Sequence, residues 1–182
     1  MEKEQIIKEM ENQEILEMIH NSENDFFAAG IFYTFDTDSR EIKFLVVNYR
    51  RDGIGPLQIK FPGGCSKEGE SPFENLVREM KTETGLFPAQ NEAEIIQHQI
   101  FPPKKNSGAY NVHHKVFFLI GKAGGILKTV SSADAGEVSP PFWMSAQNLS
   151  KVIFPGHKLA FKRACELLSF KKRDYAYALM NV

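Results

Sequence analysis

Carboxylates at helical spacing follow a pair of glycines in the first half of the chain. Gly64 is followed by Glu70 and then by the pair Arg78-Glu79. Glu83 comes four residues after Glu79, so on a helix the two carboxylates lie on one face with Arg78 beside them. Carboxylate oxygens that converge are hard ligands of the kind that Mg²⁺ and Mn²⁺ prefer. The pattern therefore indicates a site that could hold a divalent cation against a phosphate chain.

The residues around these carboxylates predict the elements that position them. Ser71 and Pro72 suit the N-cap and the first turn of a helix, and Gly85 suits its end. Just before the helix, Pro62-Gly63-Gly64 predicts a tight turn, because proline and glycine together disfavour continuous regular structure. The apolar stripe of the predicted helix consists of Phe73, Leu76, Val77 and Met80.

Two interpretations of this segment compete. Glutamates and arginines on a helix usually form a solvated face with weak ion pairs. That interpretation does not account for the glycine pair, the distant Glu70 and the closing Gly85-Leu86, which all stand in one register. In that register the segment resembles the sequence box of the Nudix hydrolase family. The matching residues are Gly64, Glu70, Arg78, Glu79, Glu83, Gly85 and Leu86, with Met80 as an apolar substitute and Thr82 in place of the first of two adjacent glutamates.

The resemblance implies an activity and a division of roles. Family members typically hydrolyse a nucleoside diphosphate linked to another moiety, by attack of water on phosphorus, so an ADP-ribose or nucleotide-sugar type of small molecule is expected. Glu79 and Glu83 match the metal-binding carboxylates, and the carbonyl of Gly64 or of the preceding glycine is a further ligand for Mg²⁺ or Mn²⁺. The cation neutralises the diphosphate and makes water a better nucleophile. Arg78 and Glu70 match a supporting pair that fixes the loop against the helix.

Further candidate residues lie outside the box. Glu137 precedes a Trp-containing segment, where many relatives carry an acidic residue, so it is interpreted as a catalytic base or an extra metal ligand; the alternative is a solvated loop glutamate. Arg50, Arg51 and Lys104 could bind substrate phosphates, although basic residues on loops are usually only solvated. His157 opens a predicted helix near the C-terminus and is expected to be exposed there.

Two other classes of function stay open. A non-catalytic Nudix module that binds a nucleotide or a partner protein is conceivable, because Thr82 removes one carboxylate; the retained Glu70, Glu79 and Glu83 favour an enzyme. An isomerase of prenyl diphosphates on the same fold would need a suitably placed cysteine. Cys65, inside the glycine segment, matches that requirement poorly.

Length and composition limit the remaining possibilities. The 182 residues predict one Nudix domain over 25–182 after an N-terminal amphipathic helical extension over 1–24, which packs on its own domain or serves as the arm of a homodimer. A net charge of −1 provides no field for polymeric nucleic acid. No apolar run reaches transmembrane length and the N-terminus lacks the apolar core of a signal peptide, so a reduced cytoplasmic protein without membrane contact is expected.

The order of the predicted elements favours an α+β fold. Strands alternate with one central helix and a second helix follows near the end, which suggests a mixed sheet between helices. The family resemblance implies the same arrangement, an α/β/α sandwich with a mixed β-sheet. Strands are predicted at 26–36, 42–50, 57–61, 95–101, 110–120 and 137–144, and the C-terminal helix at 157–170.

Overall fold

The computed structural model describes residues 13–15, 17, 26–36, 41–50, 55–100, 114–129 and 139–180, with side chains to residue 169 apart from residue 90. The strands are β1 (Phe26–Asp36), β2 (Glu41–Tyr49), β3 (Gln58–Lys60), β4 (Gly63–Cys65), β5 (Leu86–Pro88), β6 (Ala93–Ile100), β7 (His114–Ile120), β8 (Ala123–Gly125) and β9 (Phe142–Ser145). The helices are α2 (Pro72–Thr84), α3 (Ala146–Val152) and α4 (Lys158–Met180), with short 3₁₀ turns at Gln90–Glu92 and Pro155–His157.

The main sheet is mixed, as the sequence predicts. Its strands follow the order β3-β2-β1-β7-β6, and β4 and β9 add to β1 and β2. The β1–β7 pair is parallel and the other pairs are antiparallel. A parallel pair needs a long crossover connection, and the segment between β1 and β7 contains α2. A separate two-stranded sheet joins β5 to β8.

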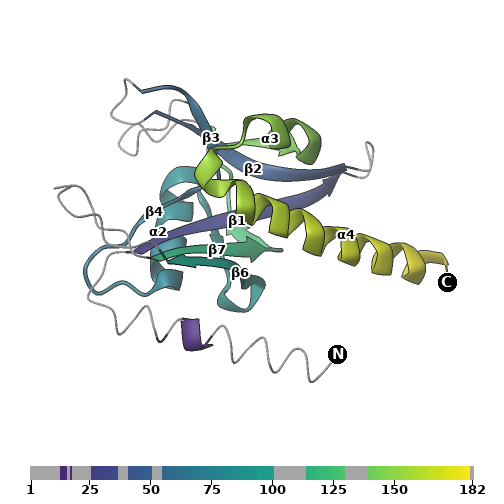
Figure 1. Cartoon of the computed structure of the whole chain (residues 1–182), viewed down its shortest axis with the longest axis horizontal. Coiled ribbons are helices and arrows are strands. Elements are labelled where there is room, and N and C mark those ends of the chain that lie inside the picture. Colours follow the sequence, from purple (N-terminus) through teal and green to yellow (C-terminus); the bar gives the residue numbers. More distant parts are fainter. Residues whose placement is uncertain are drawn as a thin grey trace.

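Helices cover both faces of the main sheet, which confirms the α/β/α arrangement. Because successive side chains of a strand point to opposite faces, β1 contributes Ala29 and Ile31 to one apolar cluster and Ala28 and Phe32 to the other. The first cluster packs against α3 and α4, and the second against α2. In Figure 1, α4 crosses in front of the strands while α2 lies behind them.

The boundaries of α2 follow the predicted signals. Ser71 is the N-cap, and its hydroxyl accepts from the backbone N–H of Glu74 while the Glu74 carboxylate accepts from the backbone N–H of Ser71. Pro72 occupies the first turn, and Gly85 ends the helix in the left-handed conformation at φ 78°. Local chemistry therefore fixes the register of the helix that carries the candidate carboxylates.

The glycine segment differs from its prediction. Gly63–Cys65 forms a short strand antiparallel to β1, whereas the sequence predicted a tight turn. Gly63 has a φ of +151°, and a Cβ at this position would lie 2.2 Å from the carbonyl oxygen of Ala28. The absence of a side chain therefore allows the backbones of β4 and β1 to approach closely, which is one reason for glycine to occur in a strand.

Other boundaries shift for identifiable reasons. The last strand begins at Phe142, after the Pro140-Pro141 pair rather than around it, because proline has no N–H for a sheet ladder. Helix α3 forms between the last strand and α4, where the sequence predicted no helix, and α4 runs ten residues beyond its predicted end, to Met180. The predicted N-terminal extension falls mostly outside the described residues, which include helical positions 13–15 and 17. Within the described part of the chain, no helix combines the length and the apolar composition that crossing a membrane would require.

Candidate functional site

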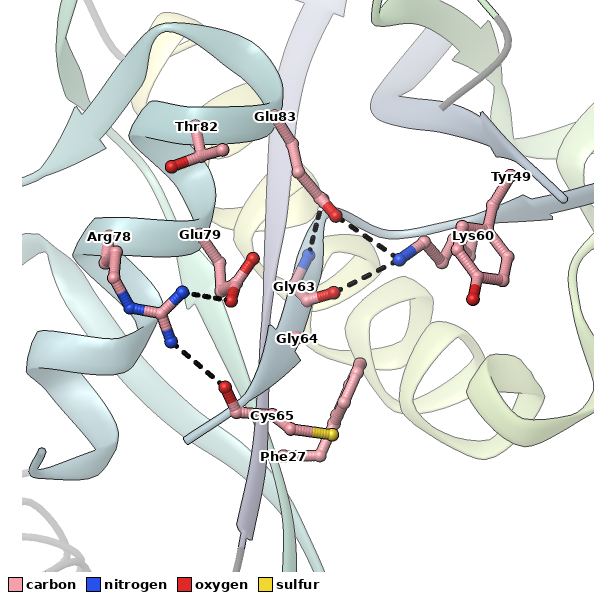
Figure 2. Close-up of a pocket in the computed structure, with 10 residues that line it drawn as sticks. All are labelled: Phe27, Tyr49, Lys60, Gly63, Gly64, Cys65, Arg78, Glu79, Thr82 and Glu83. Atoms are coloured by element: carbon pink, nitrogen blue, oxygen red, sulfur yellow. Dashed lines mark hydrogen bonds and ion pairs between the residues drawn. The ribbon is translucent and has the colours of Figure 1, made fainter. Parts of the chain in front are cut away.

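A pocket of about 420 Å³ opens between the glycine strand β4 and helix α2. Its volume is in the range of small-ligand sites in proteins. The side chains in Figure 2 come from β1, β2, β3, β4 and α2, so the pocket joins the glycine segment to the carboxylate helix as the sequence pattern suggested. The pocket is lined by Phe27, Tyr49, Lys60, Gly63, Gly64, Cys65, Arg78, Glu79, Thr82 and Glu83.

Glu83 occupies the innermost part of this site. Its side chain is only 2% exposed, and its carboxylate accepts from the backbone N–H of Gly63 at 2.7 Å. The same carboxylate accepts from Lys60 Nζ at 3.3 Å. Glu83 therefore ties α2 to the glycine strand, and its negative charge is paired with the Lys60 ammonium.

Arg78 forms the centre of a polar network behind the pocket. Its guanidinium donates from Nε and Nη2 to the two carboxylate oxygens of Glu70 at 2.5 and 2.8 Å, and from Nη2 to the carbonyl of Cys65 at 3.0 Å and to Asn75 Oδ1 at 2.7 Å. It also contacts the carboxylate of Glu79. The hydrogen bond from Arg78 holds the pKa of Glu70 below its usual range. Arg78 therefore connects the loop residue Glu70 and the glycine strand to α2, and the supporting role of Glu70 and Arg78 stays a prediction.

Glu79 faces the pocket from the same helix. Burial raises the pKa of the Glu79 carboxyl, and the neighbouring guanidinium of Arg78 partly opposes this shift. A Cβ on Gly64 would lie 2.5 to 2.8 Å from the Glu79 carboxylate, so glycine at this position is what admits the carboxylate. The position of the Glu79 side chain thus depends on Arg78, which contacts its carboxylate, and on Gly64, which leaves room for it.

The carbonyls of the two glycines point in different directions. The carbonyl of Gly64, the predicted metal ligand, accepts from Asn75 Nδ2 at 3.0 Å. The carbonyl of Gly63 accepts from Lys60 Nζ at 3.1 Å and so faces the same cation as Glu83. The geometry therefore favours the carbonyl oxygen of Gly63, rather than that of Gly64, as the backbone oxygen that could bind a metal ion in the pocket.

The other predicted residues fall into three groups. Thr82 lines the pocket together with the two glutamates of its helix. Arg50 is exposed at the end of β2 and does not contribute to the lining of this pocket, although its neighbour Tyr49 does. The predicted residues Arg51, Lys104 and Glu137 lie outside the described residues.

Three side chains of the pocket were not predicted from the sequence. Lys60, Tyr49 and Phe27 project from strands whose pairing brings them to the glycine segment. One local signal could have indicated Lys60: it stands directly before Phe61-Pro62 in a predicted strand with apolar neighbours. A lysine that is buried in such a strand usually has a charged partner. Lys60 is 9% exposed.

His157 is buried, which corrects the expectation of an exposed helix-end histidine. Its side chain is 2% exposed, and its Nδ1 accepts from the backbone N–H of Phe61 at 3.2 Å. Phe61 stacks on the imidazole, and Phe27, Phe117 and Phe154 pack around it. Burial lowers the pKa of His157 to about 3, so the ring is neutral near pH 7 and can accept this hydrogen bond. His157 therefore fixes the backbone just before the glycine strand.

Acidification is expected to destabilise the fold through His157. Between its ordinary pKa of 6.5 and its folded pKa of about 3, the unfolded chain binds a proton that the folded protein does not. The free energy of unfolding should therefore fall as pH drops through this window, by up to about 1.4 kcal/mol per pH unit. Urea denaturation at several pH values between about 7 and 5 measures the slope. His157→Phe should lose most of it, and an unchanged slope in that variant would contradict the assignment.

The oxygen donors of the pocket fit a metal ion. Glu79, Glu83 and the Gly63 carbonyl supply hard oxygens, and the Lys60 ammonium already bridges two of them, which makes it a stand-in for a cation. Among the described residues, no three acidic, histidine or cysteine side chains gather into a metal-binding group. Two carboxylates and a carbonyl suit Mg²⁺, which keeps several waters and needs few protein ligands.

A family model matches most of this chain. The model described as the NUDIX domain matches residues 26–164. The match begins at β1 and ends within α4, so it includes the sheet, α2 and the pocket. A comparison with curated proteins yields no significant match.

Several solved structures share the fold. A MutT protein from work on Aliivibrio salmonicida and Vibrio cholerae has a TM-score of 0.58 and 20% identity, over 79% of this chain and 99% of that one. The NUDIX domain of Shewanella oneidensis NrtR, solved with ADP ribose, has a TM-score of 0.59 and 15% identity, over 84% and 97%. T. brucei MERS1, solved with RNA, has a TM-score of 0.55 and 14% identity, over 71% and 54%. At these identities the similarity concerns the fold.

Proposed function

Because the chain belongs to the Nudix family, we propose that it is a divalent-metal-dependent hydrolase that cleaves a pyrophosphate bond in a nucleoside diphosphate linked to another moiety. The observation that carries the proposal is the convergence of Glu79, Glu83 and the Gly63 carbonyl on one pocket. The fold alone does not imply this chemistry, since one fold can host several functions. A set of oxygen donors that line one pocket does suit it.

Each residue of the site receives a role in this proposal. Glu79, Glu83 and the Gly63 carbonyl would hold Mg²⁺ or Mn²⁺. When bound, the cation supplies neutralisation of the diphosphate charge and activation of water. Arg78 keeps Glu79 directed toward the pocket and locks the strand to the helix through Cys65 and Glu70. Such positioning matters because a ligand that turns away loses its contribution to metal affinity.

The proposed substrate class comes from one structural neighbour. The NUDIX domain of NrtR was solved with ADP ribose, which makes ADP-ribose or a nucleotide sugar the first candidates. Glu137 remains our proposed base or extra metal ligand, and Arg50, Arg51 and Lys104 remain proposed phosphate-binding residues. A cytoplasmic location, a homodimer formed through the N-terminal extension and the absence of a polymeric nucleic acid partner also remain predictions.

A substrate screen tests the proposed function. Purified protein is incubated with Mg²⁺ or Mn²⁺ and a panel that includes ADP-ribose, nucleotide sugars and nucleoside triphosphates. Products are detected by phosphate release after coupling to a phosphatase, with a metal-free reaction as control. Metal-dependent cleavage of a nucleoside diphosphate derivative is expected. Failure to cleave any compound with either metal would contradict the proposal.

Thr82→Glu is expected to strengthen the site. Thr82 lines the pocket but its neutral hydroxyl is a poor ligand for Mg²⁺, whereas a glutamate there would add one anionic oxygen donor beside Glu79 and Glu83. The metal concentration for half-maximal rate should fall several-fold and turnover should rise. Titration of the initial rate with Mg²⁺ measures both. Thr82→Gln is the matched control, because it adds length without charge and should leave the metal dependence unchanged.

A non-catalytic binding module is the second candidate, favoured by one observation. The two pocket carboxylates are each in contact with a cationic side chain, Glu79 with Arg78 and Glu83 with Lys60, so their negative charge is largely compensated. Hydrolysis that is absent in the wild type and gained in Thr82→Glu would identify such a module. Unchanged rate and metal dependence in Thr82→Glu would instead place residue 82 outside the metal site.

A further inference from the structure

The ammonium of Lys60 occupies the position of a cation inside the pocket. Lys60 Nζ lies 3.1 Å from the carbonyl oxygen of Gly63 and 3.3 Å from Glu83 Oε1. On its remaining side, Nζ lies 4.3 Å from the centre of the Tyr49 ring, whose face attracts cations. Figure 2 shows the lysine reaching from its strand toward both oxygens, with Tyr49 beside it.

Burial strengthens the electrostatic attraction between Lys60 and Glu83. The Lys60 side chain is 11% exposed and that of Glu83 is 2% exposed, so water screens their attraction poorly. Removing one partner of such a pair leaves the other charged and buried, which is costly. The lysine therefore stabilises the arrangement of Glu83 and Gly63 that a metal ion would require.

The same contacts exclude a metal ion from these oxygens. Mg²⁺ binds oxygen at about 2.0–2.1 Å and would have to lie on the side of Glu83 and Gly63 now taken by the ammonium. An ammonium within a few ångströms of a divalent cation repels it strongly at the low effective dielectric of a buried site. The two cations cannot use the oxygen pair together.

We propose that Lys60 is an internal competitor of the divalent cation, so that the Gly63 carbonyl and Glu83 accept metal only when the Lys60 ammonium moves away. The lysine has a flexible four-carbon chain and emerges from β3 at the pocket wall, so it can leave without unfolding the strand. It thereby sets a threshold for metal binding and keeps the oxygen pair ordered below that threshold. The inference rests on the proposed metal dependence of this site.

Manganese binding to the protein without substrate tests the competition. Lys60→Met removes the charge and retains an unbranched chain of similar length, and Lys60→Gln removes the charge but keeps a hydrogen-bond donor. Free Mn²⁺ is titrated by its electron paramagnetic resonance signal in the presence of each protein. Both variants should bind Mn²⁺ at least about tenfold more tightly than the wild type. The control is Lys122→Met, which removes the same charge from a lysine that is 84% exposed and should leave the affinity unchanged.

Thermal denaturation provides a second readout. Without metal, Lys60→Met leaves Glu83 buried without this cation, so the melting temperature should fall. Added Mn²⁺ should then raise the melting temperature of Lys60→Met by more than it raises that of the wild type, because the ion replaces the lost charge. If both Lys60 variants stay unfolded even with Mn²⁺, a metal cannot replace the ammonium and the proposal is overturned.

The outcomes separate this inference from the proposed function. If the wild type binds Mn²⁺ and neither Lys60 variant binds it more tightly, the competition is overturned and the proposed hydrolase function is not. An equal gain in Lys122→Met also overturns it, because the effect would then be one of net charge. Absence of Mn²⁺ binding in all the proteins overturns both proposals. Tighter binding in the two Lys60 variants alone supports the competition.

Discussion

Glu83→Gln is expected to lower turnover by at least about 100-fold. Glu83 contributes the most buried carboxylate of the pocket, and the substitution removes an anionic oxygen while keeping the shape of the side chain. Steady-state rates at increasing Mg²⁺ concentration measure the effect on turnover and on metal dependence. Glu79→Gln should behave similarly, because its carboxylate faces the same pocket.

Stability must be measured alongside activity in this experiment. An amide oxygen in Glu83→Gln can still accept from the Gly63 N–H, but the buried Lys60 ammonium loses its counter-charge. We therefore expect the variant to remain folded with a loss of about 3–5 kcal/mol of unfolding free energy. Glu68→Gln, at an exposed position in the preceding loop, is the matched control and should leave rate and stability unchanged. Full activity of Glu83→Gln at low Mg²⁺ would contradict the assignment of Glu83 as a metal ligand.

Arg78→Ala is expected to lower both stability and activity. The substitution removes hydrogen bonds to Glu70, Asn75 and the carbonyl of Cys65, and it leaves two carboxylates without their cation. Because the Arg78 side chain is 27% exposed, we expect a moderate loss of about 2–4 kcal/mol, which corresponds to a fall of roughly 5–15 °C in melting temperature. Calorimetry and initial rates measured on one preparation test the two effects together.

The control for Arg78 is an arginine in an exposed ion pair. Arg163 pairs with Glu166 on α4 and its side chain is 52% exposed, so Arg163→Ala should change stability and activity little. An Arg78→Ala protein with an unchanged melting temperature and abolished substrate binding would show that Arg78 contacts phosphate directly. Its role would then be binding rather than positioning.

Elements determined by nearby residues were predicted well. Helix α2 has its cap at Ser71, proline at its first position and Gly85 at its end, and these contacts are all made within a few residues. The strand β1 was predicted to its end residues, because a segment rich in aromatic and β-branched residues ends at a polar turn signal. The spacing of Glu79 and Glu83 on α2 likewise placed both side chains in one pocket.

Features determined by distant residues were missed. Lys60 is buried because Glu83 lies 23 residues further along the chain and Tyr49 lies on a neighbouring strand, and no local pattern predicts such partners. His157 is buried by rings from β1 and β7 and accepts from a backbone N–H 96 residues away. The Gly63–Cys65 strand depends on pairing with β1, which overrides the local turn signal of proline and glycine. Each of these errors has the same physical cause, which is tertiary contact.

Hydrolysis in ¹⁸O-enriched water tests the central claim most directly. The wild type, Glu79→Gln and the wild type without metal are each incubated with the panel compound that is cleaved fastest, and the products are analysed by mass spectrometry. The account predicts metal-dependent cleavage of the pyrophosphate bond with one ¹⁸O in a product phosphate, and loss of this reaction in Glu79→Gln. Cleavage that persists in Glu79→Gln or without metal, or ¹⁸O found outside the phosphates, would contradict it.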